Sequence, residues 1–415
     1  MTAAPLATLL RECPIVITGM GCSSAAGHSV DQLWAAAVRG AGTAQWEDFE
    51  IGGRPVRQAV CRVAGIENAP VDVRPVRRRD RSVILAWIAA ALALRQAGYS
   101  EDRCPIQLGV LAGSSRGPLG KTAEAFSRVV ASRYPPSLAA DATFAVISGA
   151  LAQLLGVRGP SSTVSATCAS AGFAIAQAAE QILLGKADVM LAGGSDAPLY
   201  PAAIAQLGSA GVLGLADAAA ETCRPFDRHR SGLVPGEGSA FLVLESASHA
   251  RSRGAQPLAR LAGWGTCVDC AGRAGVSESG AGMVDAMERA MAAGSLNPAD
   301  VDHINTHGTA TRLNDPAEAR AIRRVFAERG AILPCSSTKP VTGHCLGATP
   351  ALEAVICVEA LRRQIVPPTA NCREVDPECA IDVVTGAARP ARLRHVMSNA
   401  LGFWGCHSSL IFGSV

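Results

Sequence analysis

Aromatic and charged residues are both scarce in this chain of 415 residues, at 4% and 18%. So few aromatic rings offer no surface on which nucleic-acid bases would stack, and a net charge of +3 is too small to indicate a nucleic-acid partner. A local basic patch could still meet an acidic protein. Hydrophobic residues make up 49% of the chain, the reverse of a disordered composition. We therefore expect a large buried core, in two domains or in one fold of two similar halves.

Long apolar runs are also missing. The longest, residues 83–94, falls short of the ~20 residues that cross a bilayer. The first dozen residues lack the basic start and apolar stretch of a secretory signal. We therefore expect a cytosolic protein, in which the 14 cysteines are small core residues or functional thiols rather than disulfides. A lone C-x-x-C, Cys267 and Cys270, favours buried structural cysteines over a metal site.

Lysine is nearly absent, since Lys121, Lys186 and Lys339 are the only lysines and almost every other cation is arginine. A lysine kept against this bias indicates a need for a compact ammonium that a guanidinium cannot replace. The inference has most weight at Lys339, because that residue lies beside a histidine motif.

The chain alternates short apolar β-branched runs with longer alanine-rich stretches. Strands are predicted at residues 14–18, 108–111 and 187–192, and a helix at 80–97 that Gly98 ends. Continuous apolar strands separated by helices predict an α/β protein with a parallel-rich sheet, covered on both faces.

The second half of the sequence repeats the pattern of the first. In each half a strand opens into a polar turn, at residues 113–115 and at 307–309. Each half then has a second polar turn before a buried helix, with Cys168 before the helix at 169–184 and His344 before the helix at about 349–361. Two halves related by a pseudo-twofold axis would bring Cys168, His307 and His344 to one cleft.

Cys168 is the candidate nucleophile. It lies between a strand and a helix and is flanked by small residues. The positive end of a helix dipole lowers the pKa of a thiol and favours the thiolate. A buried structural cysteine is an equally good interpretation of this residue taken alone.

Two histidine clusters follow. His307 precedes glycine and two hydroxyl residues, although a core histidine bonded to backbone would fit as well. His344 ends a polar, glycine-bearing segment that also contains Lys339 and leads into a helix with Glu353. A histidine there can hold developing negative charge, and a lysine or glutamate can fix its tautomer.

The segment at residues 399–405 is predicted to be a glycine-flanked aromatic loop before a final strand at 409–412. Such a loop can gate a pocket and present a backbone N–H to an oxyanion, or it can be an ordinary turn. One cysteine with downstream histidines also fits a papain-type hydrolase. Two features argue against that class. The cysteine lies deep in the chain, and two histidines with a lysine are more than such a hydrolase needs.

Six motifs in the same order resemble the elongating β-ketoacyl-acyl-carrier-protein synthases, nearly from end to end. They lie at residues 16–21, 164–170, 224–238, 307–315, 337–344 and 399–405. The resemblance implies the thiolase fold, layered αβαβα with two pseudo-twofold-related halves. Residues 1–255 would carry the nucleophilic cysteine and residues 256–415 the two histidines.

The resemblance also implies a ping-pong decarboxylative condensation. Cys168 would take an acyl chain from the phosphopantetheine of an acyl carrier protein, with the backbone N–H groups of Cys168 and Phe403 holding the oxyanion. His307 and His344 would then stabilise the enolate formed when a malonyl-carrier thioester loses CO₂. Because that loss drives the reaction, no metal or redox cofactor is expected.

Further residues take roles by the same resemblance. Lys339 would orient the histidines, supported by Asp315 and Glu353. Thr309 and Thr311 would bind the pantetheine arm, and Arg77 and Arg78 the acidic carrier protein. A homodimer, or a heterodimer with a ketosynthase-like subunit, is also implied.

Three residues depart from the family pattern. Trp404 replaces glycine and His407 replaces asparagine in the gating segment, and Arg116 replaces an apolar residue of the acyl pocket, which Phe403 and Trp404 would also line. These changes favour a specialised synthase, of type II polyketide or other secondary metabolism, over the housekeeping fatty-acid enzyme. The alternative is a non-condensing partner subunit that sets chain length in a heterodimer, but such partners usually lack the cysteine.

Overall fold

A computed structural model describes residues 3–101, 103–130, 136–270, 276–327, 329 and 332–415. Its ten-stranded sheet consists of two five-stranded halves that meet where β1 pairs with β8. The N-terminal half has the order β5-β4-β6-β7-β1 and the C-terminal half the order β10-β9-β13-β14-β8. The strands are β1 (Ile15–Ser23), β4 (Gly109–Gly113), β5 (Ser161–Val164), β6 (Val189–Asp196), β7 (Gly238–Ser246), β8 (Ala259–Val268), β9 (His303–Asn305), β10 (Cys335–Ser336), β13 (His395–Gly402) and β14 (Cys406–Gly413).

The two halves are topological copies. Counted along the chain within each half, the spatial order is third, second, fourth, fifth, first strand in both. The pairs β4–β5, β4–β6, β9–β10 and β9–β13 are parallel, and all other pairs in the sheet are antiparallel. The predicted internal repeat is therefore confirmed. The prediction of a parallel-rich sheet is wrong, because the fourth and fifth strands of each half run antiparallel to each other.

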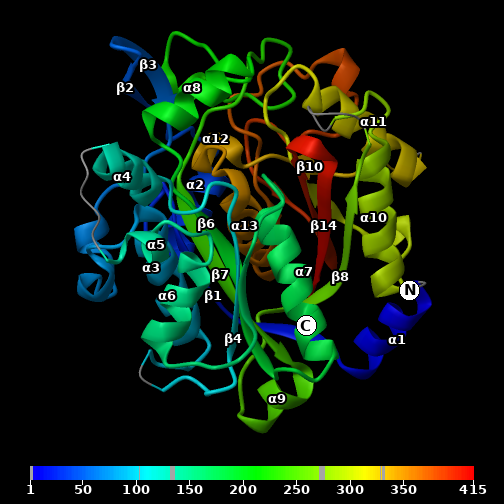
Figure 1. Ribbon diagram of the computed structural model, residues 1–415. Helices are drawn as coiled ribbons and strands as arrows, with labels where there is room; N and C mark the ends of the chain where they lie inside the picture. The colour runs from blue at the N-terminus through cyan, green and yellow to red at the C-terminus, as the bar shows by residue number, and fades with distance from the viewer. Residues whose placement is uncertain (1–2, 102, 131–135, 271–275, 328, 330–331) are drawn as a thin grey trace.

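Helices form three layers around the two half-sheets, as the thiolase fold requires (Figure 1). α3 and α6 cover the outer face of the N-terminal half, and α10, with α11 beside it, covers the outer face of the C-terminal half. α7 and α13 pack against each other between the half-sheets. These helices are α3 (Arg81–Gln96), α6 (Val146–Leu155), α7 (Ser170–Leu183), α10 (Ala281–Gly294), α11 (Asn314–Phe326) and α13 (Thr349–Arg363).

Glycines let the outer helices approach the sheet equally closely in both halves. A Cβ on Gly21 of β1 would lie 2.1 Å from the carbonyl oxygen of Ala89 in α3. A Cβ on Gly265 of β8 would lie 2.2 Å from the carbonyl oxygen of Ala286 in α10. The first strand of each half therefore needs a glycine at this position, because a side chain there would keep the outer helix away from the sheet.

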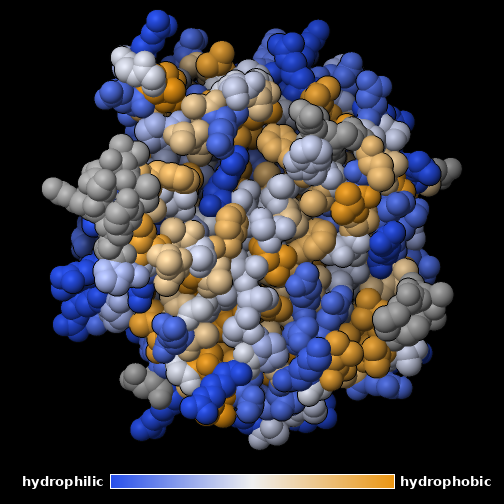
Figure 2. All heavy atoms as spheres, in the orientation of Figure 1, coloured by the Kyte–Doolittle hydropathy of each residue, from blue (hydrophilic) through white to orange (hydrophobic). Residues whose placement is uncertain are grey.

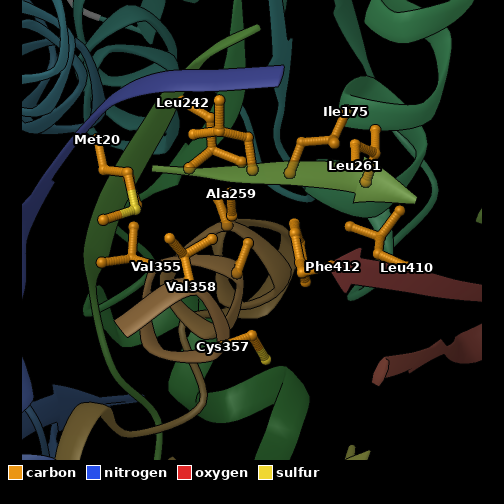
Figure 3. Packing of buried hydrophobic residues seen from close by; sticks show 14 of the residues in the cluster. Met20, Ile175, Leu242, Ala259, Leu261, Val355, Cys357, Val358, Leu410 and Phe412 are labelled. Atoms are coloured by element: carbon orange, nitrogen blue, oxygen red, sulfur yellow. The ribbon is translucent and has the colours of Figure 1, made fainter. Parts of the chain in front are cut away.

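The main core lies between the half-sheets, around α7 and α13. Figure 3 shows Ile175 of α7 and Val355 of α13 facing Leu242, Leu261 and Phe412 from strands of both halves. Because one cluster joins residues of both halves, neither half has this core to itself. The prediction of a division after residue 255 stays a prediction, although β8 begins the second set of strands just after it.

The remaining elements lie around this frame. Hydrophilic and hydrophobic residues are interspersed over the face shown in Figure 2. Within the described part of the chain, no helix is both long and apolar enough to cross a membrane. The other elements are α1 (Ala3–Glu12), α2 (Val30–Arg39), β2 (Gln45–Ile51), β3 (Arg54–Val60), α4 (Leu119–Val130), α5 (Leu138–Asp141), α8 (Pro201–Ser209), α9 (Ala247–Ser252), the buried α12 (Lys339–Thr342), β11 (Ile365–Val366) and β12 (Arg389–Pro390).

Candidate active site

Cys168 lies in a tight turn between β5 and α7. The preceding residue, Thr167, has φ of 50°, in the left-handed region that a β-branched residue rarely adopts. Ser170 stabilises the turn, since its hydroxyl accepts from the N–H of Ala166 at 2.9 Å and donates to the carbonyl of Thr167 at 2.5 Å. The turn therefore holds the cysteine directly before the N-terminus of α7, where the sequence predicted it.

The protonation state of Cys168 differs from expectation. The thiol is buried, and burial raises its pKa to about 12, although the ammonium of Lys339 and the guanidinium of Arg116 act in the opposite direction. The prediction of a lowered pKa is thus wrong for the resting site. Burial therefore favours the neutral thiol at this position.

His307 follows β9, and a carboxylate that the sequence analysis did not single out fixes its backbone. Glu318 of α11 accepts from the N–H of His307 at 2.7 Å and from the N–H of Gly308 at 2.8 Å. Burial raises the pKa of Glu318 to about 7. Its position one helical turn after Asp315, on the same face of α11, was the signal that could have found it.

His344 lies between α12 and α13. Its backbone N–H donates to the carbonyl of Val234 at 2.7 Å, and its Nδ1 lies 3.1 Å from the hydroxyl of Thr349. Thr349 begins α13, so the first turn of that helix orients the ring. The sequence analysis did not identify Thr349 either.

The two histidine rings meet edge to face, with centroids 5.4 Å apart and an interplanar angle of 81°. Burial lowers the pKa of both rings well below the usual value of histidine, and the ammonium of Lys339 acts in the same direction. Both imidazoles are therefore neutral at physiological pH. Lys339 also acts on the pKa of Cys168, so its charge reaches all three predicted catalytic residues.

Lys339 is fully buried and pairs with the fully buried Glu353, at 2.7 Å between Nζ and Oε1. Burial raises the pKa of Glu353 to about 7, although Lys339 opposes the shift. The ammonium has no direct hydrogen bond to either histidine among the described residues. Its orienting role must therefore act through its charge.

The segment beyond β13 passes over the cysteine. The hydroxyl of Thr167 donates to the carbonyl of Phe403 at 3.3 Å, and a Cβ on Gly402 would lie 2.9 Å from the backbone nitrogen of Cys168. Residues up to Gly402 belong to β13, so the predicted loop at 399–405 is in fact a strand followed by the short 3-10 turn Phe403–Gly405. Trp404 in this turn has φ of 63° and is 61% exposed, so it lies at the surface of the site.

Comparison with known proteins identifies the family. Residues 12–250 match the beta-ketoacyl synthase N-terminal domain, and residues 258–373 match the beta-ketoacyl synthase C-terminal domain. The chain belongs to the β-ketoacyl synthase family.

Relatives and solved structures agree. The chain is 37% identical to nodulation protein E of Rhizobium meliloti, over 97% of this chain and 99% of that protein. It is 34% identical to 3-oxoacyl-[acyl-carrier-protein] synthase 2 of Staphylococcus aureus, over 96% and 97%. A solved type II PKS ketosynthase in complex with its acyl-carrier protein, AntDE:AntF, superposes with a TM-score of 0.87 at 26% identity, over 97% of this chain and 100% of that one.

In this β-ketoacyl synthase Arg116 lies near the cysteine, on a loop that a buried carboxylate ties to both halves. Asp196 accepts from the N–H groups of Ser115 and Arg116 in the N-terminal half and of Gly347 in the C-terminal half, at 2.8–3.0 Å. The guanidinium of Arg116 donates to Gln206 at 2.7 Å, while its buried Nε has no partner in the part of the chain that the structure describes. Asp196 is a further residue that the sequence analysis missed.

The predicted pantetheine and carrier residues lie on separate parts of the synthase. The hydroxyls of Thr309 and Thr311 are 2.9 Å apart, and Asp315 accepts from the N–H of Thr309 at 3.1 Å. Asp315 therefore supports the loop after His307. Arg77 and Arg78 are exposed, just before α3. The roles given to these residues stay predictions.

None of the 14 cysteines, which all lie in the described part of the chain, forms a disulfide. Cys267 is half-buried and its thiol lies 3.1 Å from the carbonyl of Gly282, whereas Cys270 is exposed. The prediction of buried cysteines in the C-x-x-C is thus wrong for Cys270, because this residue lies beyond the end of β8 at an exposed position.

Proposed function

We propose that this chain is a β-ketoacyl-acyl-carrier-protein synthase that joins an acyl group on Cys168 to a malonyl unit by decarboxylative Claisen condensation. The observation that carries the proposal is the pair of neutral histidines, 5.4 Å apart, that share the field of Lys339 with a cysteine in a strained turn. One thiol and two uncharged N–H donors suit acyl transfer followed by stabilisation of an enolate.

In the first half-reaction the sulfur of Cys168 attacks the carbonyl carbon of an acyl thioester. A bond forms between that carbon and the sulfur of Cys168, and the bond to the pantetheine sulfur breaks. The cysteine proton leaves with the pantetheine thiol. We assign the oxyanion to the N–H groups of Cys168 and Phe403, a role that their lack of a turn or loop hydrogen bond among the described residues supports.

In the second half-reaction a malonyl thioester binds beside the acyl-cysteine. Its carboxylate leaves as CO₂, and the electron pair of the broken carbon–carbon bond becomes an enolate. The N–H groups of His307 and His344 hold the enolate oxygen. The enolate carbon attacks the acyl carbonyl, and the sulfur of Cys168 leaves and takes up a proton. Atoms and electrons balance without an oxidant or reductant, so we propose that no cofactor takes part.

The remaining predicted residues support these steps. Lys339, paired with Glu353, keeps both histidines uncharged, and Asp315 holds the loop that carries Thr309 and Thr311 against the pantetheine arm. Arg116, Phe403 and Trp404 surround the acyl group.

An acyl carrier protein is the proposed donor of both substrates, with Arg77 and Arg78 as its contact. We propose further that the synthase works as a dimer in the cytosol, since 14 cysteines that form no disulfide fit a reducing environment. It elongates chains in fatty-acid or, better fitting Arg116, Trp404 and His407, type II polyketide synthesis.

Mass spectrometry of the intact protein tests the proposal after incubation with a series of acyl-carrier proteins. We expect a covalent acyl adduct that Cys168→Ala removes and that malonyl-carrier protein converts to a 3-oxoacyl product. Cys270→Ala is the matched control, since Cys270 is the exposed thiol most open to adventitious acylation. No adduct with any donor would favour a non-condensing partner subunit, and release of free acid without use of malonyl groups would indicate a thioesterase.

A further inference from the structure

A third histidine, His407, lies behind His307 and has no role in the reaction as proposed above. It is on β14 and only 2% exposed. Neither ring nitrogen has a hydrogen-bond partner among the described residues, and Nε2 is 4.0 Å from the carboxylate of Asp269, beyond hydrogen-bond reach. A buried polar group without a partner costs free energy. The position of His407 therefore calls for a partner other than the described side chains.

A small cavity adjoins both His307 and His407, with room for about one water molecule. Met283 and Ala286 of α10 form an apolar wall of it, and Glu318 and Asn399 supply further polar groups. Such a cavity, with polar groups around it, is the kind that holds an ordered water in folded proteins.

The other polar side chains around the cavity already have partners, except the hydroxyl of Ser408, which lies against Gly172 of α7. Both oxygens of Glu318 accept backbone N–H groups, and the side-chain oxygen of Asn399 accepts from the hydroxyl of Ser409 at 2.7 Å. Among the nitrogens around the cavity, those without a partner in the described residues are the two ring nitrogens of His407 and Nδ1 of His307. Nε2 of His307 is not one of the buried atoms that lack a partner. It is therefore the ring nitrogen that can face the substrate.

We propose that His407 is a positioning residue for His307, and that a water bound between the two rings fixes the tautomer of His307. The water donates to Nδ1 of His307 and accepts the N–H of His407. The proton of His307 then stays on Nε2, where it meets the enolate oxygen. The inference rests on the proposed condensation and adds to it a reason for the direction in which His307 presents its proton.

The charge state of His407 fits this role. Burial lowers its pKa to about 4, so at neutral pH the ring is uncharged and has one donor and one acceptor. A neutral ring beside His307 also avoids a second positive charge next to the field of Lys339.

Two substitutions separate a positioning role from a purely structural one. His407→Leu keeps much of the volume and removes both nitrogens, whereas His407→Gln keeps a donor and an acceptor. Ser408→Ala is the matched control, because its side chain points to the opposite face of β14, toward Gly172 of α7. For each variant, Cys168 acylation, malonyl-carrier condensation and thermal unfolding are measured separately.

We expect His407→Leu to slow condensation by on the order of 10- to 1,000-fold, because an imidazole in the wrong tautomer presents no proton to the enolate. Acylation of Cys168 should change little, and His407→Gln should restore most of the condensation rate. Long-range ¹H–¹⁵N spectra of protein labelled in its 8 histidines should show His307 losing its single tautomer in His407→Leu.

The inference is overturned if His407→Leu condenses at the wild-type rate with an unchanged His307 signal. It is also overturned if acylation and condensation fall in parallel with the unfolding temperature. Failure of the proposed function looks different, because the wild-type protein would then form no acyl adduct on Cys168.

Discussion

Lys339 and Glu353 form a salt bridge in which both side chains are fully buried, so the charge of each is balanced by the other. Taking two such charges out of water costs several kcal/mol for each ion, and their attraction recovers this only when both are present. A buried ion pair is thus a poor source of stability. Its value to this protein lies in the charge that it places beside two histidines and a thiol.

Loss of one partner should therefore destabilise more than loss of both. We expect Glu353→Leu to lower the free energy of unfolding by about 3–5 kcal/mol, because it leaves a buried ammonium unpaired. The double variant Lys339→Met with Glu353→Leu should regain most of that stability in urea denaturation but no condensing activity. A double variant as unstable as Glu353→Leu would show that the pair itself stabilises the fold.

His303 gives a pH prediction away from the chemistry. Its ring is buried against the hydroxyl of Ser336 at 3.0 Å, and burial lowers its pKa from 6.5 to about 3. The unfolded chain therefore binds a proton below pH 6.5 that the folded chain does not bind, so this residue costs stability as pH falls. Between pH 7.5 and 4.5 the cost reaches about 3 kcal/mol.

Comparison with His303→Asn isolates this effect from the buried carboxylates, whose raised pKa values act in the opposite direction. We expect the variant to gain about 3 kcal/mol relative to wild type between those two pH values, measured by urea unfolding at each. A difference that does not depend on pH would mean that His303 is protonated in the folded protein.

Among the elements, the junction of β13 with the turn before α7 decides whether the nucleophile is well placed. Gly402 ends β13 against that turn, and an added Cβ would lie within 2.9 Å of the Cys168 nitrogen and closer still to the hydroxyl of Thr167. No side chain fits there without moving the cysteine.

We expect Gly402→Ala to slow acylation of Cys168 by about 100-fold, since a displacement of ~1 Å has that effect on positioned reactants. Gly149→Ala is the matched control. Gly149 lies inside α6 with nothing within 4 Å of an added Cβ, so alanine there should raise stability by up to about 1 kcal/mol and leave acylation unchanged. Normal acylation by Gly402→Ala would show that the turn can move freely.

Elements were easier to predict from the sequence than their pairing. The helix predicted at 80–97 is α3, and the strand predicted at 108–111 is β4, because apolar runs and a capping Asp80 are local signals. The direction in which β7 pairs with β1 depends on residues that are more than 200 positions apart in the sequence, such as Ser23 and Ser239. No local pattern encodes such a pairing.

The site divides in the same way. Motif residues such as Cys168, His307 and His344 could be found because their types and spacing are distinctive. Glu318 was missed, since a carboxylate that binds backbone N–H groups looks like any helix glutamate, and only its spacing from Asp315 on α11 sets it apart. The pKa of Cys168 was predicted in the wrong direction because burial by both halves is a property of the folded molecule and not of the turn.

At the scale of the whole molecule, exposed apolar side chains lie near one end of the sheet. Phe126 of α4 is 70% exposed and Phe144, just before α6, is 43% exposed. α6 packs on β5, the edge strand of the N-terminal half, which has a neighbour in the sheet on one side only. Unpaired edges and exposed aromatic rings are typical of surfaces that a second subunit covers.

We expect the double variant Phe126→Glu with Phe144→Glu to convert the proposed dimer to a monomer, because two charges would have to be buried at the interface. Light scattering after size-exclusion chromatography measures the mass, and circular dichroism checks that the fold is intact. Leu215→Glu, at another strongly exposed apolar residue, is the control. A double variant that stays dimeric would place the interface elsewhere.

The carboxylate of Asp196 has a consequence for how substrates enter. It accepts hydrogen bonds from backbone N–H groups of the loop after β4 and of Gly347, so it links two half-sheets that already share one core. A hinge motion between the halves would have to break these hydrogen bonds and expose the core. We therefore expect an acyl chain to be admitted by movement of the three-residue turn Phe403–Gly405, in which Trp404 has a left-handed backbone, and not by a hinge between the halves.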